Sequence, residues 1–265
     1  MTICIAAKCE NNTNIVAASD KLLTIRGLIE FDHPSSKIEK LMENCCIMTA
    51  GNALATTELF EDIKEEISEY RDITIRDIAR ITKEKYILHR SREIGERYLA
   101  ARNINNIDEF YEKIMNLPPN IGMYLDDKIE NYDFDLEVLI GGIDQNGAHI
   151  YNIVNPGCVN CFDSIGYCAI GSGEQHSILS LISYNYDPHL STNSALYIIY
   201  EAKKIAEKAP GVGKETVLAL LTDKGLYEIS NTVIQELEDI YTSKKRLQEL
   251  KHEELDKRID ELKII

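Results

Sequence analysis

Apolar and polar positions in the first fifty residues predict short β-strands separated by turns. An apolar run at 2–8 and a second at 15–18, with a polar, asparagine-rich cluster between them, predict a hairpin. After a polar stretch at 32–36, alternation over 37–41 and an apolar run over 45–50 predict two more strands. The chain therefore opens with β-structure.

Beyond residue 52 the pattern becomes helical. Apolar residues recur at steps of four between Glu and Lys residues, as on one face of a helix, at Leu59, Ile63 and Ile67. A second helix is predicted from Thr74, a candidate N-cap, to about residue 100. The stretch 103–134 is interrupted by Pro118-Pro119 and gives no clear period, so it is left without an assignment.

The second half repeats this order of strands followed by helices. Strands are predicted at 136–143 and 149–154, joined by an Asn-Gly turn, and another leads to 169–173. Two helices follow, with apolar positions at 178–182 and 195–205, and then a strand at 217–222. From about 231 to the end the pattern predicts one further helix.

Strand runs and helix runs are segregated along the chain, which argues against a doubly wound parallel sheet. Two antiparallel sheets packed together, with helix pairs outside them, fit the order, and the fold class is α+β. We expect one domain over 1–242, with a longer helical and loop segment at about 90–134. A charged helical extension at 243–265 either packs on this domain or docks onto a neighbouring subunit.

The composition narrows the functional classes. The 265 residues carry a net charge of −15, which disfavours binding to nucleic acid or to anionic membranes. No apolar run approaches the ~20 residues of a membrane span, and the start lacks the pattern of a signal peptide. Seven cysteines without an export signal indicate reduced thiols and a cytoplasmic protein.

Metal or cofactor chemistry has little support in the sequence. Cys158 and Cys161 form a single CxxC pair with no second pair of ligands at a suitable spacing for zinc. The βαβ context of a redox motif is also missing. We expect no metal and no cofactor.

The candidate chemistry begins at Thr2. Removal of Met1 would leave a threonine whose hydroxyl is a nucleophile and whose free α-amine is its own base. Further polar or small residues follow at the ends of predicted strands or within a turn: Asp20, Lys37, Gly51 and Ser172.

These residues, in this order and spacing, resemble the landmarks of the proteasome-type N-terminal-nucleophile hydrolases. The resemblance also includes the segment Leu139–Asp144 and extends to about residue 225. The Met-Thr start, Ala18-Ser19-Asp20 and the segment 49–57 look closest to Anbu-type bacterial proteasome homologues. The resemblance implies a four-layer αββα sandwich.

The resemblance also implies a threonine peptidase or amidohydrolase. Thr2 would form an acyl-enzyme with a peptide or protein substrate, with Asp20 orienting Lys37 and Lys37 activating the hydroxyl. Gly51 would donate its N–H to the oxyanion, and Ser172 would lie by the amine. The family implies a homo-oligomer, whether ring, spiral or dimer, and leaves an unfoldase partner undefined.

The chain also departs from the family pattern. The loop at 208–214 contains neither the aspartate nor the serine that the family places near the catalytic amine, and Leu22 stands where an arginine is frequent. Two alternatives therefore stay open: a proteasome-like structural subunit without catalysis, or a non-proteolytic amide chemistry such as transpeptidation.

Overall fold

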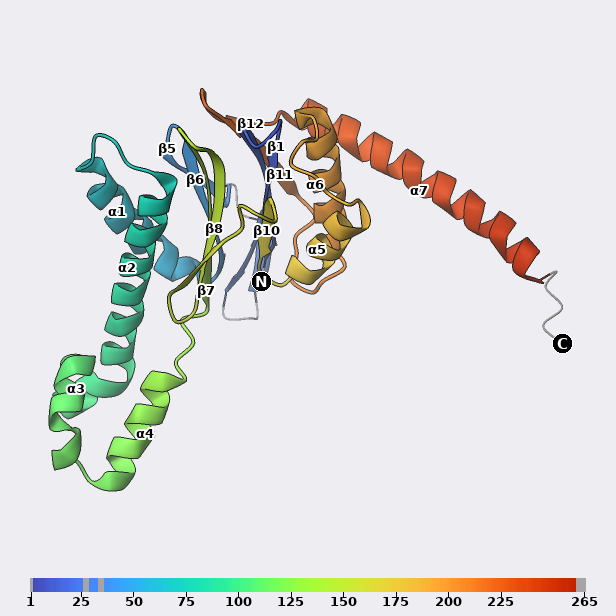
Figure 1. Ribbon diagram of the computed structural model, residues 1–265. Helices are drawn as coiled ribbons and strands as arrows, with labels where there is room; N and C mark the ends of the chain where they lie inside the picture. Colours follow the sequence, from blue (N-terminus) through green and yellow to red (C-terminus); the bar gives the residue numbers. More distant parts are fainter. Residues whose placement is uncertain (1, 26–28, 33–35, 261–265) are drawn as a thin grey trace.

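The computed structural model describes residues 2–25, 29–32 and 36–260 (Figure 1). Met1, most of the polar stretch expected at 32–36, and the last five residues of the expected C-terminal helix lie outside the described residues.

Strands and helices alternate in groups along the chain. The strands are β1 (Cys4–Cys9), β2 (Asn14–Asp20), β3 (Leu22–Ile25), β4 (Ile29–Asp32), β5 (Ile38–Met42), β6 (Cys45–Gly51), β7 (Leu136–Asp144), β8 (Gly147–Val154), β9 (Cys158–Cys161), β10 (Tyr167–Ile170), β11 (Thr216–Thr222) and β12 (Gly225–Glu228). The α-helices are α1 (Ala53–Ser68), α2 (Ile75–Ile94), α3 (Ile107–Lys113), α4 (Pro119–Glu130), α5 (Glu174–Ser183), α6 (Thr192–Ala206) and α7 (Asn231–Asp260).

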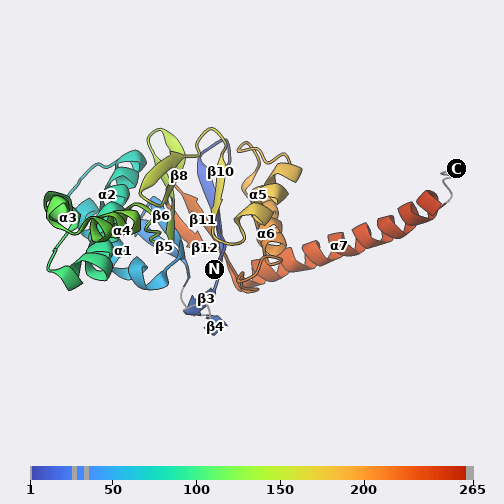
Figure 2. The same ribbon diagram turned by 90° about the horizontal axis from the view of Figure 1, so that it is seen from below.

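The described strands form two five-stranded antiparallel sheets and one separate hairpin. One sheet has the order β10-β1-β2-β11-β12, and the other has the order β5-β6-β7-β8-β9. The two sheets pack face to face, with α1 and α2 on the outer side of one and α5 and α6 on the outer side of the other (Figures 1 and 2). This mixture of helix and antiparallel sheet is compatible with the α+β class.

Burial of both faces explains the apolar run at the start of the chain. In β1 and the residue before it, Ile3, Ile5 and Ala7 pack with α5 and α6. The alternate residues Cys4 and Ala6 face the second sheet. Because neighbouring side chains in a strand point to opposite faces, a strand between two apolar layers needs no polar positions.

The helical segments mostly follow the sequence pattern. Thr74 caps α2 by accepting a hydrogen bond from Asp77 N at 3.2 Å, as the sequence indicates. The expected helix to about residue 100 is α-helical only to Ile94 and continues as a π-helical and a 3₁₀ turn. The unassigned stretch 103–134 contains α3 and α4, which extend away from the sheets beyond the end of α2 (Figure 1).

The hairpin β3–β4 is a feature that the sequence pattern missed. Its two strands pair with each other, from Leu22 opposite Asp32 to Ile25 opposite Ile29, and join neither five-stranded sheet. A hairpin outside the two large sheets need not carry the buried, alternating pattern from which strands are recognised.

The C-terminal helix α7 projects from the body of the molecule (Figures 1 and 2). Its first half is attached to the α5–α6 layer, because Lys244 Nζ donates to both carboxylate oxygens of Glu201 at 2.8 Å. Lys204 also pairs with Glu238 at 3.4 Å. None of the described helices combines the length and the apolar character that crossing a membrane requires.

Candidate active site

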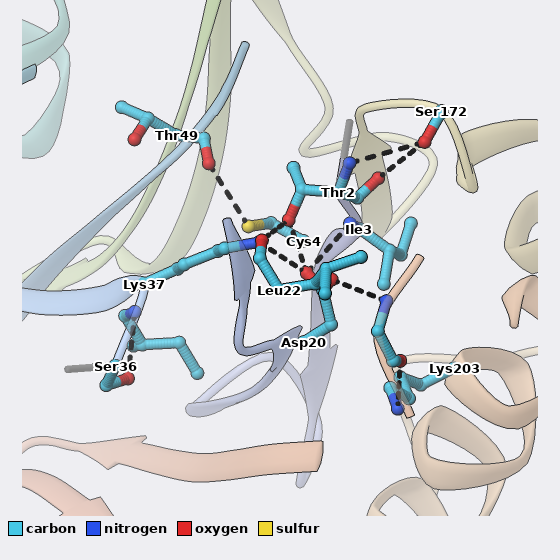
Figure 3. Close-up of polar contacts among 12 residues, drawn as sticks. Thr2, Ile3, Cys4, Asp20, Leu22, Ser36, Lys37, Thr49, Ser172 and Lys203 are labelled. Atoms are coloured by element: carbon cyan, nitrogen blue, oxygen red, sulfur yellow. Dashed lines mark hydrogen bonds and ion pairs between the residues drawn. The ribbon is translucent and has the colours of Figure 1, made fainter. Parts of the chain in front are cut away.

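Thr2 lies two residues before β1 and beside Gly51 of the other sheet, with only 3% of its surface exposed. Its hydroxyl donates a hydrogen bond to Asp20 Oδ1 and accepts one from Lys37 Nζ (Figure 3). Its backbone nitrogen donates to Ser172 Oγ at 3.2 Å. The hydroxyl and the nitrogen of one residue are thus held by separate polar groups.

Asp20, the last residue of β2, is fully buried and accepts from four donors. Two of them are the Thr2 hydroxyl and Lys37 Nζ, the latter at 2.7 Å. The others are backbone groups: Ile3 N lies 3.2 Å from Oδ1, and Gly213 N lies 2.7 Å from Oδ2. These contacts offset the cost of removing a carboxylate from water.

Lys37 lies just before β5, and its side chain is 11% exposed. Besides Thr2 and Asp20, its ammonium reaches the carbonyl oxygen of Leu22 at 2.6 Å. An ammonium group has three N–H donors, and each finds an acceptor here. The side chain is therefore fixed with its nitrogen against the threonine hydroxyl.

Two glycines shape the backbone around Thr2. At Gly51, with φ of +106°, a Cβ would lie 2.0 Å from the carbonyl oxygen of Asp135. At Gly171, with φ of +94°, it would lie 2.5 Å from the carbonyl oxygen of Thr2. Since only glycine fits such positions, the chain can bring Ser172 to the backbone of Thr2, where Ser172 Oγ also donates to the carbonyl oxygen at 3.3 Å.

Two cavities meet at Thr2 and Gly51. The larger has a volume of about 440 Å³ and includes Gly171, Ser172 and three acidic residues in its lining. The smaller, of about 40 Å³, includes Lys37, Leu22 and Thr49. Both open beside the threonine, so a ligand can approach its hydroxyl.

The loop at 208–214 contributes to the site through its backbone. As the sequence indicates, it has no aspartate or serine for the Thr2 amine; instead Gly213 N binds Asp20. Lys203 of α6, fully buried, donates to the carbonyl oxygens of Gly213 and Lys214, each at 2.9 Å, and pairs with Glu207 at 2.7 Å. Burial lowers the pKa of Lys203, and Glu207 opposes that shift.

Sequence reasoning did not find Lys203 or Gly213. A signal for Lys203 exists, since it lies one turn after Ile199 in the apolar stripe of α6, where a lysine is unexpected. Gly213 offers no comparable signal, because any residue but proline carries a backbone N–H.

The cysteine beside Thr2 is buried, whereas the two cysteines of the CxxC pair are exposed. Cys4 lies in the site, with its sulfur 3.6 Å from the carbonyl oxygen of Thr49, and burial raises the pKa of its thiol to about 12. Cys158 and Cys161 are exposed and stand three positions apart on β9, so their side chains point to opposite faces. With Cα atoms about 10 Å apart, they cannot form a disulfide with each other.

In the part of the chain that the structure describes, no group of three or more His, Cys, Asp or Glu side chains is arranged to hold a metal ion.

Of the site residues predicted from the sequence, the structure brings Thr2, Asp20 and Lys37 into direct contact. It also places Ser172 on the backbone nitrogen of Thr2 and Gly51 in the wall of both cavities.

Comparison with known proteins gives an independent view of this arrangement. No family model matches the chain. The chain is 25% identical to proteasome subunit beta 1 of Korarchaeum cryptofilum over 199 residues, which cover 71% of this chain and 85% of that protein. It is 32% identical to proteasome subunit beta of Natrialba magadii over 94 residues, or 35% of this chain and 37% of that protein.

A third match is proteasome subunit beta 2 of Thermofilum pendens, 29% identical over 93 residues, which are 35% of this chain and 44% of that protein. Together these similarities relate the chain to the proteasome β subunits, and so to the proteasome-like N-terminal-nucleophile hydrolases. The resemblance stated from the sequence is thereby confirmed as a relationship.

Proposed function

We propose that the chain is a threonine-type N-terminal-nucleophile hydrolase that cleaves peptide or amide bonds after removal of Met1. One observation carries the proposal: Lys37 and Asp20 converge on the hydroxyl of Thr2, while Ser172 holds its backbone nitrogen. The relationship to proteasome β subunits supports it. With Met1 gone, that nitrogen becomes a free α-amine.

The reaction starts with attack of Thr2 Oγ1 on the carbonyl carbon of the substrate. The hydroxyl proton passes to a base, which is the neutral α-amine or a neutral Lys37. The C–N bond of the tetrahedral intermediate then breaks, the leaving amine takes up the proton, and an ester to Thr2 remains. Water hydrolyses this ester, releasing the acid and restoring the hydroxyl.

The remaining residues have supporting roles in this proposal. Asp20 orients Lys37 through their contact at 2.7 Å, and the ammonium form of Lys37 stabilises the developing alkoxide. Gly51 donates its N–H to the oxyanion, an interaction worth about 3 kcal/mol in sites of this kind. Ser172 positions the amine through the hydrogen bond already seen at 3.2 Å.

We further propose that the two sheets and the flanking helix pairs form the four-layer αββα sandwich of these hydrolases. The order of strands in each sheet and the apolar clusters between successive layers support this assignment. The domain would span 1–242, including the helical segment at about 90–134, followed by the extension at 243–265. An Anbu-like, cytoplasmic protein is part of the same proposal.

Self-assembly is also proposed. The relatives are named as proteasome subunits, which supports an oligomer of this chain. Exposed apolar residues on the projecting part of α7, among them Leu247 and Leu250, support a contact with a second copy.

One observation favours a second candidate, a structural subunit without catalysis. The loop at 208–214 offers the Thr2 amine neither a carboxylate nor a hydroxyl. Under this alternative, Asp20 and Lys37 would only stabilise the junction of the two sheets. Transpeptidation is the catalytic variant, in which an amine rather than water takes the acyl group from Thr2.

The test is covalent labelling of the intact protein. Mass spectrometry first reports whether Met1 is absent; a retained Met1 contradicts the proposal. A β-lactone probe is then expected to acylate Thr2, with the adduct located on the N-terminal peptide. Thr2→Ala should abolish this adduct, and Lys37→Ala should slow its formation about 100-fold or more.

Lys40→Ala is the matched control, since Lys40 lies three residues further on and pairs with Glu43 at the surface. It should label at the wild-type rate. A folded protein without Met1 that forms no adduct would support the structural subunit. Addition of an amine acceptor separates transpeptidation, which gives a new amide, from hydrolysis, which gives the acid.

A further inference from the structure

The larger cavity beside Thr2 has an acidic wall. The chain entering β7 reads Asp133-Phe134-Asp135-Leu136-Glu137, in which acidic and apolar residues alternate. Phe134 and Leu136 are buried in the core, while all three acidic residues line the cavity. Asp135 has a positive φ of 51°, so this stretch is not a regular strand before Leu136, and the common cavity is what brings the three acidic residues together.

Basic side chains of the described residues do not neutralise this wall. None lines the larger cavity, and none forms an ion pair with Asp133, Asp135 or Glu137. The contacts of the wall are to backbone groups: Glu137 accepts from Gly171 N at 2.8 Å, and Asp133 accepts from Asp135 N at 2.9 Å. Lys37 instead lines the smaller cavity and is paired with Asp20.

The electrostatic influence of the wall extends to a neighbouring residue. Burial, and then the negative charge of Glu137, raise the pKa of Glu174 at the start of α5. The part of this shift that comes from Glu137 shows that its negative charge acts on a neighbouring carboxylate.

The same cavity contains the reactive group of the proposed reaction. Thr2, Gly51 and Ser172 share its lining with the three acidic residues. Its volume of about 440 Å³ is large enough for a side chain as well as the reacting bond. A substrate that reaches the Thr2 hydroxyl through this opening lies against the carboxylates.

We infer that the larger cavity binds a cationic group next to the bond to be cleaved, so that the preferred substrates carry a lysine or arginine side chain or a free α-ammonium there. This inference rests on the proposed function, whose site it specifies. Acidic peptides are correspondingly disfavoured, because they would place like charges together without a counter-charge. The chain thereby discriminates among substrates by charge.

The experiment uses internally quenched peptides of one length that differ only beside the cleaved bond. Lysine, leucine or glutamate is placed on each side in turn, and a further pair carries a free or an acetylated N-terminus at that position. We expect kcat/KM for the lysine or free-amine peptide to exceed that for the glutamate peptide at least about tenfold. The ratio should fall as salt is added.

Substitution of the wall tests the cause of this preference. The double variant Asp133→Asn with Asp135→Asn should bring the ratio of kcat/KM for the lysine peptide to that for the glutamate peptide within about threefold of unity. Glu137→Gln should also lower this ratio, and its amide oxygen can still accept from Gly171 N. Asp223→Asn is the matched control, because Asp223 lies in the exposed turn before β12 and outside the cavity. It should leave the ratio unchanged.

Binding measurements separate this inference from the proposed function. The Thr2→Ala variant keeps the acidic wall, so fluorescence anisotropy should show tighter binding of the lysine peptide than of the glutamate peptide even without turnover. Equal binding and equal kcat/KM across the charge series would overturn the inference while leaving the hydrolase proposal intact. Charge-dependent binding without any cleavage or labelling would support the inference and contradict the hydrolase proposal.

Discussion

At the scale of single residues, Asp20 organises the site. Its two carboxylate oxygens bind the Thr2 hydroxyl, the Lys37 ammonium and two backbone N–H groups that come from distant parts of the chain. A buried carboxylate with this many donors has little freedom to rotate, so it fixes the direction of Lys37. The nucleophile and its activating lysine are therefore positioned by one side chain.

The cysteines permit a direct test at the same scale. Since burial raises the pKa of the Cys4 thiol to about 12, almost none of it is thiolate at pH 8, and it should not react with iodoacetamide despite lying beside Thr2. The two exposed thiols, Cys158 and Cys161, should react. Intact-mass analysis of the native protein is expected to show two adducts, and peptide mapping should place them on β9.

Guanidinium-unfolded protein is the control for this prediction, because all seven cysteines are then accessible. A native adduct on Cys4 would mean that the buried thiol is opened or ionised, and it would make Cys4 a rival of Thr2 as the nucleophile.

At the scale of elements, the loop at 208–214 contacts the site through its backbone, because it has no aspartate or serine side chain to offer. Lys203 on α6 donates to the carbonyl oxygens of Gly213 and Lys214, and the N–H of Gly213 donates to Asp20. At Gly213 a Cβ would lie 2.7 Å from the Cβ of Leu22 and 3.0 Å from Asp20 Oδ2, so the loop passes as close as a glycine allows. The helix α6 is thereby connected to the site through one loop.

This connection predicts the behaviour of Lys203→Met. Methionine fills a similar volume but leaves the two carbonyl oxygens without their donor and Glu207 without its partner. We expect a loss of about 2–4 kcal/mol in the free energy of unfolding, measured by urea denaturation. The rate of β-lactone labelling should also fall more than it does in a remote destabilised variant.

Ile129→Val serves as that remote variant, since Ile129 is buried in α4, far along the chain from the loop. Lys203→Arg keeps the charge and the donors and should recover part of the labelling rate. If Lys203→Met labels at the wild-type rate under conditions where it stays folded, the loop does not position Asp20.

The same elements show what a sequence can and cannot predict. The strands β1 and β2 were predictable because burial on both faces leaves an unbroken apolar run, and Thr74 marked the start of α2 by its capping side chain. Thr2, Asp20 and Lys37 could be singled out because their side chains carry the chemistry. The contact of Gly213 with Asp20 could not, because it is made by a backbone group and depends on the tertiary path of the loop.

At the scale of the whole molecule, α7 is too long to be accounted for by packing on one domain. Its 30 residues extend about 45 Å, and among the side chains that the structure describes, the last one anchored to the α5–α6 layer is that of Lys244. Further along, Leu247 and Leu250 are each 61% exposed. Several apolar side chains on one projecting helix are typical of a surface that is covered in an assembly.

We therefore expect the full chain to self-associate through α7. Sedimentation velocity should give a mass greater than one chain for the native protein, and Leu247→Glu with Leu250→Glu should shift it toward the monomer. Because both side chains are exposed in the single chain, the double variant should retain its free energy of unfolding at dilutions where the native protein is also monomeric, within about 1 kcal/mol. Gln248→Glu adds charge between these two positions and should leave the mass unchanged. A native protein that sediments as a monomer at micromolar concentration, or a double variant that assembles as the native chain does, would remove α7 as the contact between copies.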